Sequence, residues 1–455
     1  MGHPRTGHRS SNEEGVVRLQ RRGLLAWAGA AAAAATLSAC GGKSSSSSTL
    51  SSACTPSPTP TWQDAKSHGS GRLNMLSALY QDQASQDSYA NNMLTGFFAG
   101  TGYSLAATYT SLDKLPDKVI TSLAAGKLAD VLMPGQGWVP VLERQNALAE
   151  MPADITDGLN LDQRLMTGCY WGDKLFALPY ALDLTVIGYR TDVLADAGIS
   201  APPRTLDELR EMAKQLNAPD HGGFDVFGAG VVHLWAMLVG SYGGSLFTPK
   251  GGLAFNDGTG VKALDYIIGL VKDGTADPAK IPTDGAQPLF IQQKTAMSPM
   301  SSTLWPALRR SHLDDEGHLG FFPLPPDQAS KDPVVLQTGT QLAVSRQSQF
   351  KEVAFQFCQY ALQSQPLLSA VSMLPAVPPR SDVIAGSQLA GNRVMSAGLA
   401  NVRYATASLG GCPAWLDLEP VIEGQLMAAI RGQQSSDMTV GNLAKVVSDS
   451  LSRGA

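Results

Sequence analysis

The first part of the folded sequence alternates between strand-like and helix-like patterns, and this alternation restricts the possible folds more than any other feature. Apolar runs predict strands, and segments with apolar residues at helical spacing predict the helices between them. They follow in the order strand 72–80, helix 85–98, strand 103–110, helix 117–128 and strand 129–134. Parallel strands need such crossover connections, so the sequence predicts an α/β fold with a parallel sheet. Later, Thr205 and Glu208 form a capping box, which predicts a helix from Leu206.

The N-terminus has the pattern of an export signal. Basic residues ending in Arg21-Arg22 precede an apolar run over 24–36, which is too short to cross a bilayer as a helix. The paired arginines resemble a twin-arginine signal, and Leu37-Ser38-Ala39-Cys40 resembles a lipoprotein box, in which Cys40 is acylated. We therefore expect residues 1–39 to be a removable signal peptide, the alternative being a plain secretory signal with a chance cysteine.

A low-complexity segment follows Cys40. Residues 40–71 hold a serine run and alternating prolines, which cannot build a core and predict a flexible tether, so the body should begin near Arg72. Removing residues 1–39, with five basic and two acidic residues, changes the formal charge from −5 to −8. This balance gives no support to nucleic-acid binding, which needs clustered cations.

The remaining cysteines and the short motifs argue against a metal site and against familiar catalysis. Cys54 lies in the tether, and Cys169, Cys358 and Cys412 match no metal-binding spacing, so we expect thiols or one disulfide. A Ser348-x-x-Lys351 match is interpreted as a helix N-cap rather than a nucleophile. No phosphate loop, hydrolase elbow or zinc-protease motif is present, so the sequence predicts neither an enzyme nor a cofactor.

Several segments, taken in order, resemble one family. They are "LADVLMPGQGWVPVLERQNALAEM", "GDKLFALPYALDLTVIGYRTDVLADAGISAPPRTLDELREMAKQL", "SYGGSLF", "KTAMSPMSSTLWPAL" with "GHLGFFPLPP", and "GTQLAVSRQSQFKEVAFQFCQYAL". Together they are similar to the extracellular solute-binding proteins of carbohydrate ABC importers, the maltose-binding-protein-like group. The likeness covers about residues 72–450.

This resemblance implies two α/β lobes joined by a hinge, with a ligand in the cleft between them. One lobe would hold residues 72–182 and 336–374, and the other would hold 183–335 and 375–455. Because open parallel sheets bind ligands beyond the carboxyl ends of their strands, the loops after the first and third strands should face the cleft.

Asp183 is the strongest candidate ligand residue, because it places a carboxylate in an apolar run at the first crossover. A sugar offers hydroxyl donors and an apolar ring face, so its site needs acceptors and flat aromatic surfaces. A carboxylate forms a charge-assisted hydrogen bond with a hydroxyl. The alternative is that Asp183 only caps local backbone groups at the hinge.

The resemblance also implies further ligand residues. They are Gln136, Trp138, His233, Trp235, Trp305, Trp415, Gly339 and Thr340, together with Tyr80, Gln81 and Asp82 after the first strand. For each aromatic residue the alternative is core packing, and for His233 it is an ordinary internal hydrogen bond. For 80–82 and 339–340 the alternative is a simple turn. The sequence departs from the maltose-binding pattern at Gly137 and Trp138, where that pattern has an acidic–basic pair, so maltose-type ligands are not implied.

The implied activity is capture of a sugar or sugar derivative and its delivery to an ABC permease with a separate ATPase. The protein would be a monomer, lipid-anchored through Cys40 on the outer face of the cytoplasmic membrane. Two alternatives stay open: a ligand that is a glycerophosphodiester or amino sugar, and a ligand-sensing lipoprotein without an importer.

Overall fold

The computed structural model describes residues 62–228, 230–280, 287–313, 317–384, 391–407 and 409–452. The predicted signal peptide, Cys40 and Cys54 lie outside the described residues. Met1–Pro58 and Thr59–Ala455 separate into two units, and everything below concerns the second. None of the described helices combines the length and apolar composition needed to cross a bilayer.

Most strands belong to one continuous mixed sheet. The strands are β1 (Ser70–Ser77), β2 (Gly102–Tyr109), β3 (Val131–Leu132), β4 (Tyr170–Trp171), β5 (Lys174–Leu175), β6 (Ala177–Arg190), β7 (Gly222–Phe224), β8 (Thr295–Ser301), β9 (Leu319–Phe322), β10 (Val335–Val344) and β11 (Ala405–Ala407). Their order is β2-β1-β3-β10-β6-β8-β7, with β11 on β10 and β9 on β6, while β4 and β5 pair separately.

Helices surround this sheet. They are α1 (Gln83–Tyr89), α2 (Thr95–Phe98), α3 (Leu115–Ala124), α4 (Val139–Glu143), α5 (Thr191–Asp196), α6 (Leu206–Gln215), α7 (Val231–Ser241), α8 (Thr259–Lys272), α9 (Trp305–Arg310), α10 (Lys351–Ala361), α11 (Ser364–Val371), α12 (Ser381–Ile384), α13 (Arg393–Ala400), α14 (Trp415–Ile430) and α15 (Ser436–Ser452). A π-helical turn, Ala90–Leu94, joins α1 to α2, so the predicted helix over 85–98 is continuous.

The predicted parallel unit is confirmed. β1 pairs in parallel with both β2 and β3, and α1–α2 and α3 form the crossovers. The predicted cap is also confirmed, because the Thr205 hydroxyl accepts from the Glu208 N–H at 3.2 Å. The Glu208 carboxylate accepts from the N–H of Arg204, one position before the residue that a standard capping box uses.

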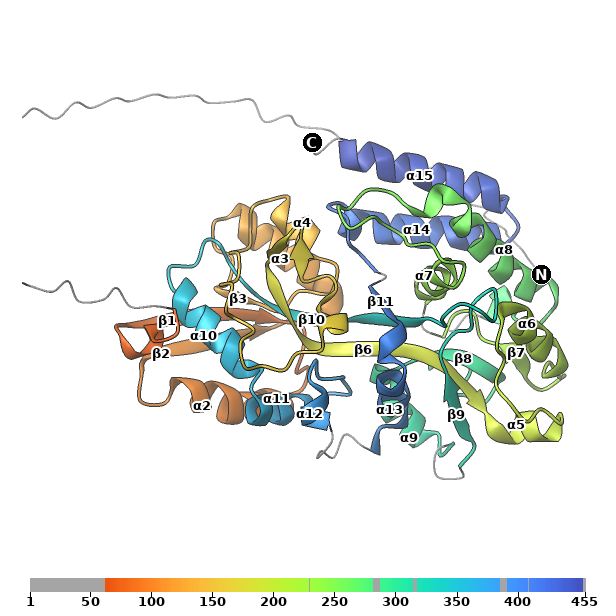
Figure 1. Ribbon diagram of the computed structural model, residues 1–455, viewed down its shortest axis with the longest axis horizontal. Helices are drawn as coiled ribbons and strands as arrows, with labels where there is room; N and C mark the ends of the chain where they lie inside the picture. Colours follow the sequence, from red (N-terminus) through yellow and green to blue (C-terminus); the bar gives the residue numbers. More distant parts are fainter. Residues whose placement is uncertain are drawn as a thin grey trace, which may run out of the picture. The chain divides into compact units, whose positions relative to one another are not determined.

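Two antiparallel strands, β6 and β10, connect the two sides of the sheet. Figure 1 shows β6 running from the side of β1, β2 and β3 to the side of β7, β8 and β9. The residues of β6 from Ala177 to Gly188 are buried, as expected for a strand covered on both faces. Asp183 pairs with Thr338 of β10 in the middle of this crossing.

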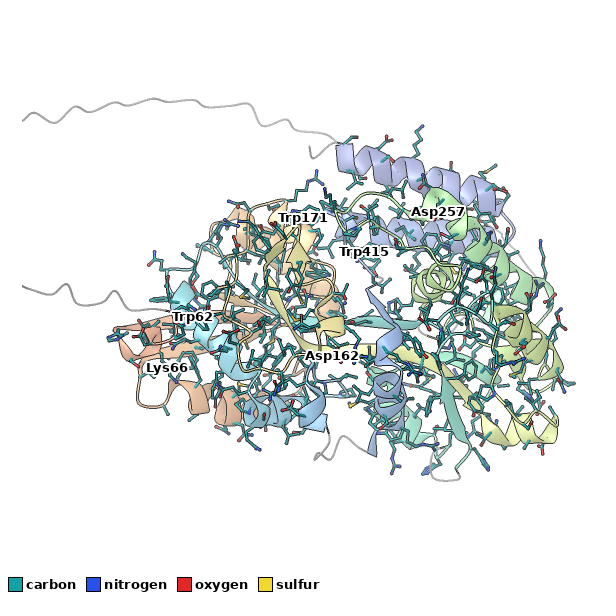
Figure 2. All side chains as sticks on the ribbon, viewed as in Figure 1. Trp62, Lys66, Asp162, Trp171, Asp257 and Trp415 are labelled. Atoms are coloured by element: carbon teal, nitrogen blue, oxygen red, sulfur yellow. The ribbon has the colours of Figure 1, made fainter. Side chains whose placement is uncertain are left out.

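Three sequence predictions need correction. The body begins before Arg72, because the Trp62 indole N–H donates to Asp154 at 2.9 Å and the Lys66 N–H donates to Gln356 at 2.7 Å. Figure 2 labels Trp62 and Lys66 on the folded body. The chain also stays beside α10 and α11 after Leu374, since Arg380 donates to the Leu362 carbonyl and to the Ser364 hydroxyl, so a boundary at 374/375 is too early.

The third correction concerns Ser348. Helix α10 has Phe350 as its N-cap, and Ser348 lies two residues earlier, where its hydroxyl accepts from the Phe350 N–H and donates to Asp130. The remaining boundaries between the two predicted lobes stay predictions.

The three cysteines of the body are free thiols. Cys169, Cys358 and Cys412 are buried, and none forms a disulfide. Burial raises the pKa of Cys412 to about 11 and that of Cys358 to about 12, which disfavours the reactive thiolate form.

Candidate functional site

A cavity of about 1030 Å³ lies where β6 and β10 cross between the two sides of the sheet. Its walls come from the loops after β1 and β3, the start of α3, the middle of β6 and β10, the start of α7, the turn after β8, and α14. The predicted residues on it are Gln136, Trp138, Asp183, His233, Gly339, Thr340 and Trp415. The loops after the first and third strands therefore reach this cavity, as the strand-end rule predicts.

Asp183 lies on the cavity wall, but its carboxylate is already engaged. It accepts hydrogen bonds from the Ser302 N–H at 2.8 Å and from the hydroxyls of Ser301 and Ser302. A carboxylate has about four acceptor positions, so these three bonds leave roughly one for a ligand. The geometry fits the capping role, in which Asp183 ties the crossing strand β6 to the 3-10 turn Ser302–Leu304.

We expect Asp183→Ala to lower the free energy of unfolding by about 2 kcal/mol, because it leaves buried donors without their acceptor. Urea denaturation of the variant and of a matched Asp157→Ala control, which removes an exposed carboxylate, measures this. Equal stability of the two variants would contradict the capping role.

The loop after β3 lies on the cavity wall and is hydrogen-bonded to β10. The Gln136 N–H donates to the Gly339 carbonyl at 2.8 Å, and its side-chain amide N–H donates to the Thr167 carbonyl at 3.2 Å. The Gln136 side-chain oxygen is buried and has no protein partner among the described residues. Such an atom costs free energy unless water or a ligand bonds it.

His233 presents a second unpartnered atom. Its Nδ1 is buried and has no partner within the described part of the chain. Burial lowers the pKa of His233, with the charge of Asp183 acting in the opposite direction, so the imidazole is neutral at neutral pH. A neutral imidazole can both donate and accept a hydrogen bond.

Helix α14 forms the wall that carries an aromatic ring and a second carboxylate. Trp415, Glu419 and Pro420 all line the cavity, and the Trp415 side chain, one turn before Glu419, favours the charged form of that carboxylate and so acts to lower its pKa. Burial raises the pKa of Glu419, and the nearby Glu423 adds to this. Pro420 has no N–H, so the carbonyl of Leu416, also on the wall, lacks its usual helical donor.

The structure places Trp235 in the core rather than on the cavity. Its side chain is fully buried, its indole N–H donates to the Gly260 carbonyl at 3.0 Å, and its ring packs edge-on against Phe255. The prediction that this ring faces the cleft is therefore wrong, because the face of α7 that carries Trp235 packs against α8 and the turn before it.

The segment 80–82 also lies off the cavity, although Ala78 and Leu79 just before it line the wall. Tyr80 is buried, stacks on Tyr89 and shares a hydrogen bond with the Tyr180 hydroxyl. Gln81 donates to the Thr110 carbonyl, and Asp82 is the N-cap of α1. These three residues hold the loop in place, so their predicted position in the ligand site is corrected.

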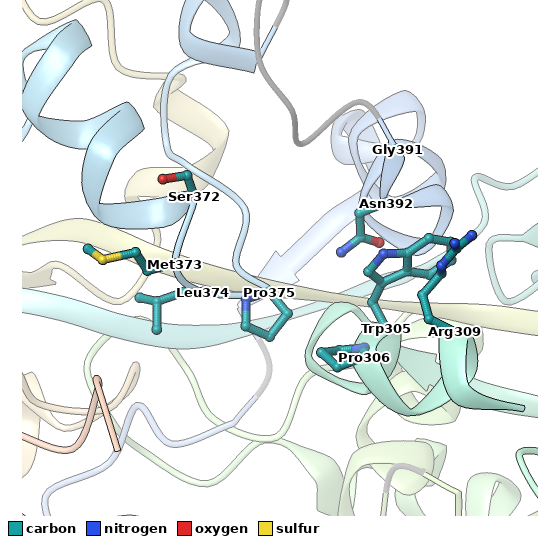
Figure 3. Close-up of a pocket in the computed structure, with 9 residues that line it drawn as sticks. All are labelled: Trp305, Pro306, Arg309, Ser372, Met373, Leu374, Pro375, Gly391 and Asn392. Carbon is teal, nitrogen blue, oxygen red and sulfur yellow. The ribbon is translucent and has the colours of Figure 1, made fainter. Parts of the chain in front are cut away.

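Trp305 lines a neighbouring pocket of about 510 Å³ instead of the main cavity. Figure 3 shows its indole beside Arg309, whose guanidinium carbon lies 5.9 Å from the ring centroid. The two pockets share Leu374 and Pro375 as a common wall. Trp305 is thus adjacent to the candidate site.

Several polar lining residues were not predicted from the sequence, namely Asp113, Ser301, Thr303, Thr338 and Glu419. A local signal existed only for Glu419, which follows Trp415 by four residues and so shares its helix face. Among the described residues, no group of His, Cys, Asp and Glu side chains is arranged to hold a metal ion.

Comparison with known proteins assigns the chain to a family. The family described as "Bacterial extracellular solute-binding protein" matches residues 81–366. The chain belongs to this family. A "Probable ABC transporter-binding protein" of Deinococcus radiodurans is 31% identical to this solute-binding protein over 210 residues, which are 43% of the chain and 49% of that relative. The match thus spans about half the length of the relative.

Other relatives extend the likeness. The "Diacetylchitobiose binding protein DasA" of Streptomyces coelicolor is 23% identical over 297 residues, covering 64% of this chain and 69% of that protein. The structure of the sugar-binding protein MalE from Xanthomonas citri matches 84% of this chain and 98% of its own with a TM-score of 0.72 and 18% identity. That match confirms the two-lobed α/β fold.

Proposed function

We propose that this solute-binding protein captures a sugar or sugar derivative in the cavity and delivers it to an ABC permease powered by a separate ATPase. The observation that carries the proposal is a cavity whose wall combines polar side chains with aromatic rings. Gln136, Asp183 and His233 provide polar groups, and Trp138 and Trp415 provide the rings. This is the combination that a hydroxyl-rich ligand with an apolar face needs.

The volume supports a small ligand. Cavities of roughly 300–1,000 Å³ hold small molecules, and about 1030 Å³ leaves room for one sugar unit or a few. The named relatives are binding proteins, and DasA and MalE bear the names of sugar binders. These names describe those proteins, and we extend the sugar class to this chain as part of the proposal.

A ligand screen tests the function. The purified chain is heated with mono- and disaccharides, amino sugars and glycerophosphocholine, and each hit is measured by calorimetry. We expect at least one carbohydrate to raise the midpoint of unfolding, since a ligand that binds only the folded state stabilises it. Stabilisation by glycerophosphocholine alone would reassign the ligand class, and no stabilisation by any compound would contradict capture.

We further propose that the protein is exported and held on the outer face of the membrane by lipid on Cys40. A fatty acyl chain contributes about 0.8 kcal/mol per buried methylene, so two chains anchor a protein firmly. The Cys40→Ala variant should lose incorporation of labelled palmitate and leave the membrane fraction. A variant that stays in that fraction and keeps the label would contradict the anchor, and Cys54→Ala is the matched control.

A further inference from the structure

The charged groups of the cavity have one sign. Asp113, Asp183 and Glu419 line it, and among its described lining residues none is Lys or Arg. The neighbouring cations do not reach the wall: Lys114 acts on Asp113, and Arg144 acts on Cys412, but neither lines the cavity.

The three carboxylates differ in how strongly neighbouring groups of the protein already interact with them. Asp183 is bonded by two serines. Asp113 stands at the exposed rim, where a hydrogen bond from Ser111 lowers its pKa, so it is ionised. Glu419 lies near the Trp415 side chain and near another carboxylate, Glu423. Negative charge in the cavity is therefore not balanced by a cation on its wall.

The other polar groups of the wall bring no positive charge. Gln136 lies on the wall as a neutral amide, and the hydroxyls of Thr303, Thr338 and Thr340 can both donate and accept hydrogen bonds. His233 is neutral, because burial lowers its pKa. The sign of the ligand's charge is therefore what most distinguishes one ligand from another at this wall.

Building on the proposed function, we propose that the cavity selects sugars by charge, favouring a protonated amino group and rejecting an anionic one. An ammonium supplies three donors and offsets the negative charge of Glu419 and Asp113, whereas a carboxylate or phosphate would meet like charge in a partly desolvated space. The ligand class is thus an amine-bearing sugar, with neutral sugars bound more weakly and uronates or sugar phosphates excluded.

A series of sugars that differ in a single substituent tests this charge selection. Calorimetry compares 6-amino-6-deoxy, parent and 6-carboxylate forms of glucose and of galactose, and compares glucosamine with N-acetylglucosamine. We expect each amine to bind on the order of tenfold tighter than its neutral analogue, the effect of one charge-assisted hydrogen bond, and each acid to bind weakest. An acid that binds as tightly as its neutral analogue, or amines that gain nothing, would overturn the charge selection while leaving sugar capture intact. Absence of binding by all of these sugars would instead count against the proposed function itself.

Variants separate charge selection from a structural role. Glu419→Gln keeps the size and shape of the side chain but removes its charge, so the ratio of the affinity for the amine to the affinity for the acid should fall by on the order of tenfold. Asp417→Asn is the matched control, since Asp417 is an exposed acid of the same helix that does not line the cavity. An unchanged preference in Glu419→Gln, or an equal change in Asp417→Asn, would refute the assignment.

Discussion

Replacing Gly339 with alanine is expected to lower the free energy of unfolding by about 4 kcal/mol, from backbone strain and steric overlap together. Gly339 has φ +123°, which L side chains rarely adopt. A β-carbon there would lie 2.5 Å from the Ala181 carbonyl oxygen and 2.6 Å from the α-carbon of Leu182. Both contacts are backbone, so no side-chain rotation can relieve them.

The substitution would also disturb the cavity wall, because Gly339 is paired with Leu182 where β10 crosses β6. Urea unfolding of Gly339→Ala against Gly126→Ala measures the effect. Gly126 also has positive φ, +66°, but nothing lies within 4 Å of its added β-carbon, so the control carries strain without overlap. If the two variants lost the same stability, close strand packing would not be the reason for Gly339.

The early α/β pattern could be predicted from the sequence because its signals are local. Strands β1, β2 and β3 are marked by apolar runs, and Thr205 carries its own helix signal in the next three residues. The strand-end rule pointed to the loops after β1 and β3, and the family resemblance pointed to Gln136 and Trp138 in the second of these loops; both residues line the cavity. The strand and helix predictions needed only neighbours in the chain.

Contacts between residues far apart in the sequence decide which of the predicted aromatic residues lie on the cavity wall, and no local sequence pattern encodes those contacts. Trp235 and Trp415 both lie in helices and are both nearly fully buried. The indole N–H of Trp235 donates to the carbonyl of Gly260, 25 positions away, whereas Trp415 lies on the cavity wall. Large apolar rings serve cores and sites alike, so residue type alone could not separate these two roles.

Asp183 illustrates the same limit for a polar residue. Its carboxylate was predicted at the crossover, yet its partners Ser301 and Ser302 lie 118 and 119 positions further along. Only the pairing of β6 with β8, which sets Thr185 opposite Ser301, brings them together. The sequence allowed the alternative that Asp183 caps backbone groups at the hinge. Only the three-dimensional structure shows that Ser301 and Ser302 are the donors to its carboxylate.

Gly137→Ala is expected to weaken ligand binding by about 100-fold, because Gly137 lies between the lining residues Gln136 and Trp138 and packs against the loop at 409–411. Its backbone carbonyl accepts from the Gly411 N–H at 3.2 Å, and an added β-carbon would lie 2.2 Å from the Leu409 carbonyl oxygen. Gly137 falls in the first predicted lobe and the partner loop in the second, so the overlap would act against the closed arrangement. A penalty of about 2.7 kcal/mol, in the range of such overlaps, corresponds to that factor.

Calorimetry with the sugar found in the screen measures the affinity, and small-angle scattering with and without that sugar measures closure. Gly411→Ala is the matched control, since Gly411 has φ +88° in the same contact but open space around its β-carbon. Ligand can favour closure only by binding that form more tightly, so a variant that resists closure must lose affinity in proportion. Wild-type affinity in Gly137→Ala, or an equal loss in Gly411→Ala, would mean that closure does not depend on this contact between glycine backbones.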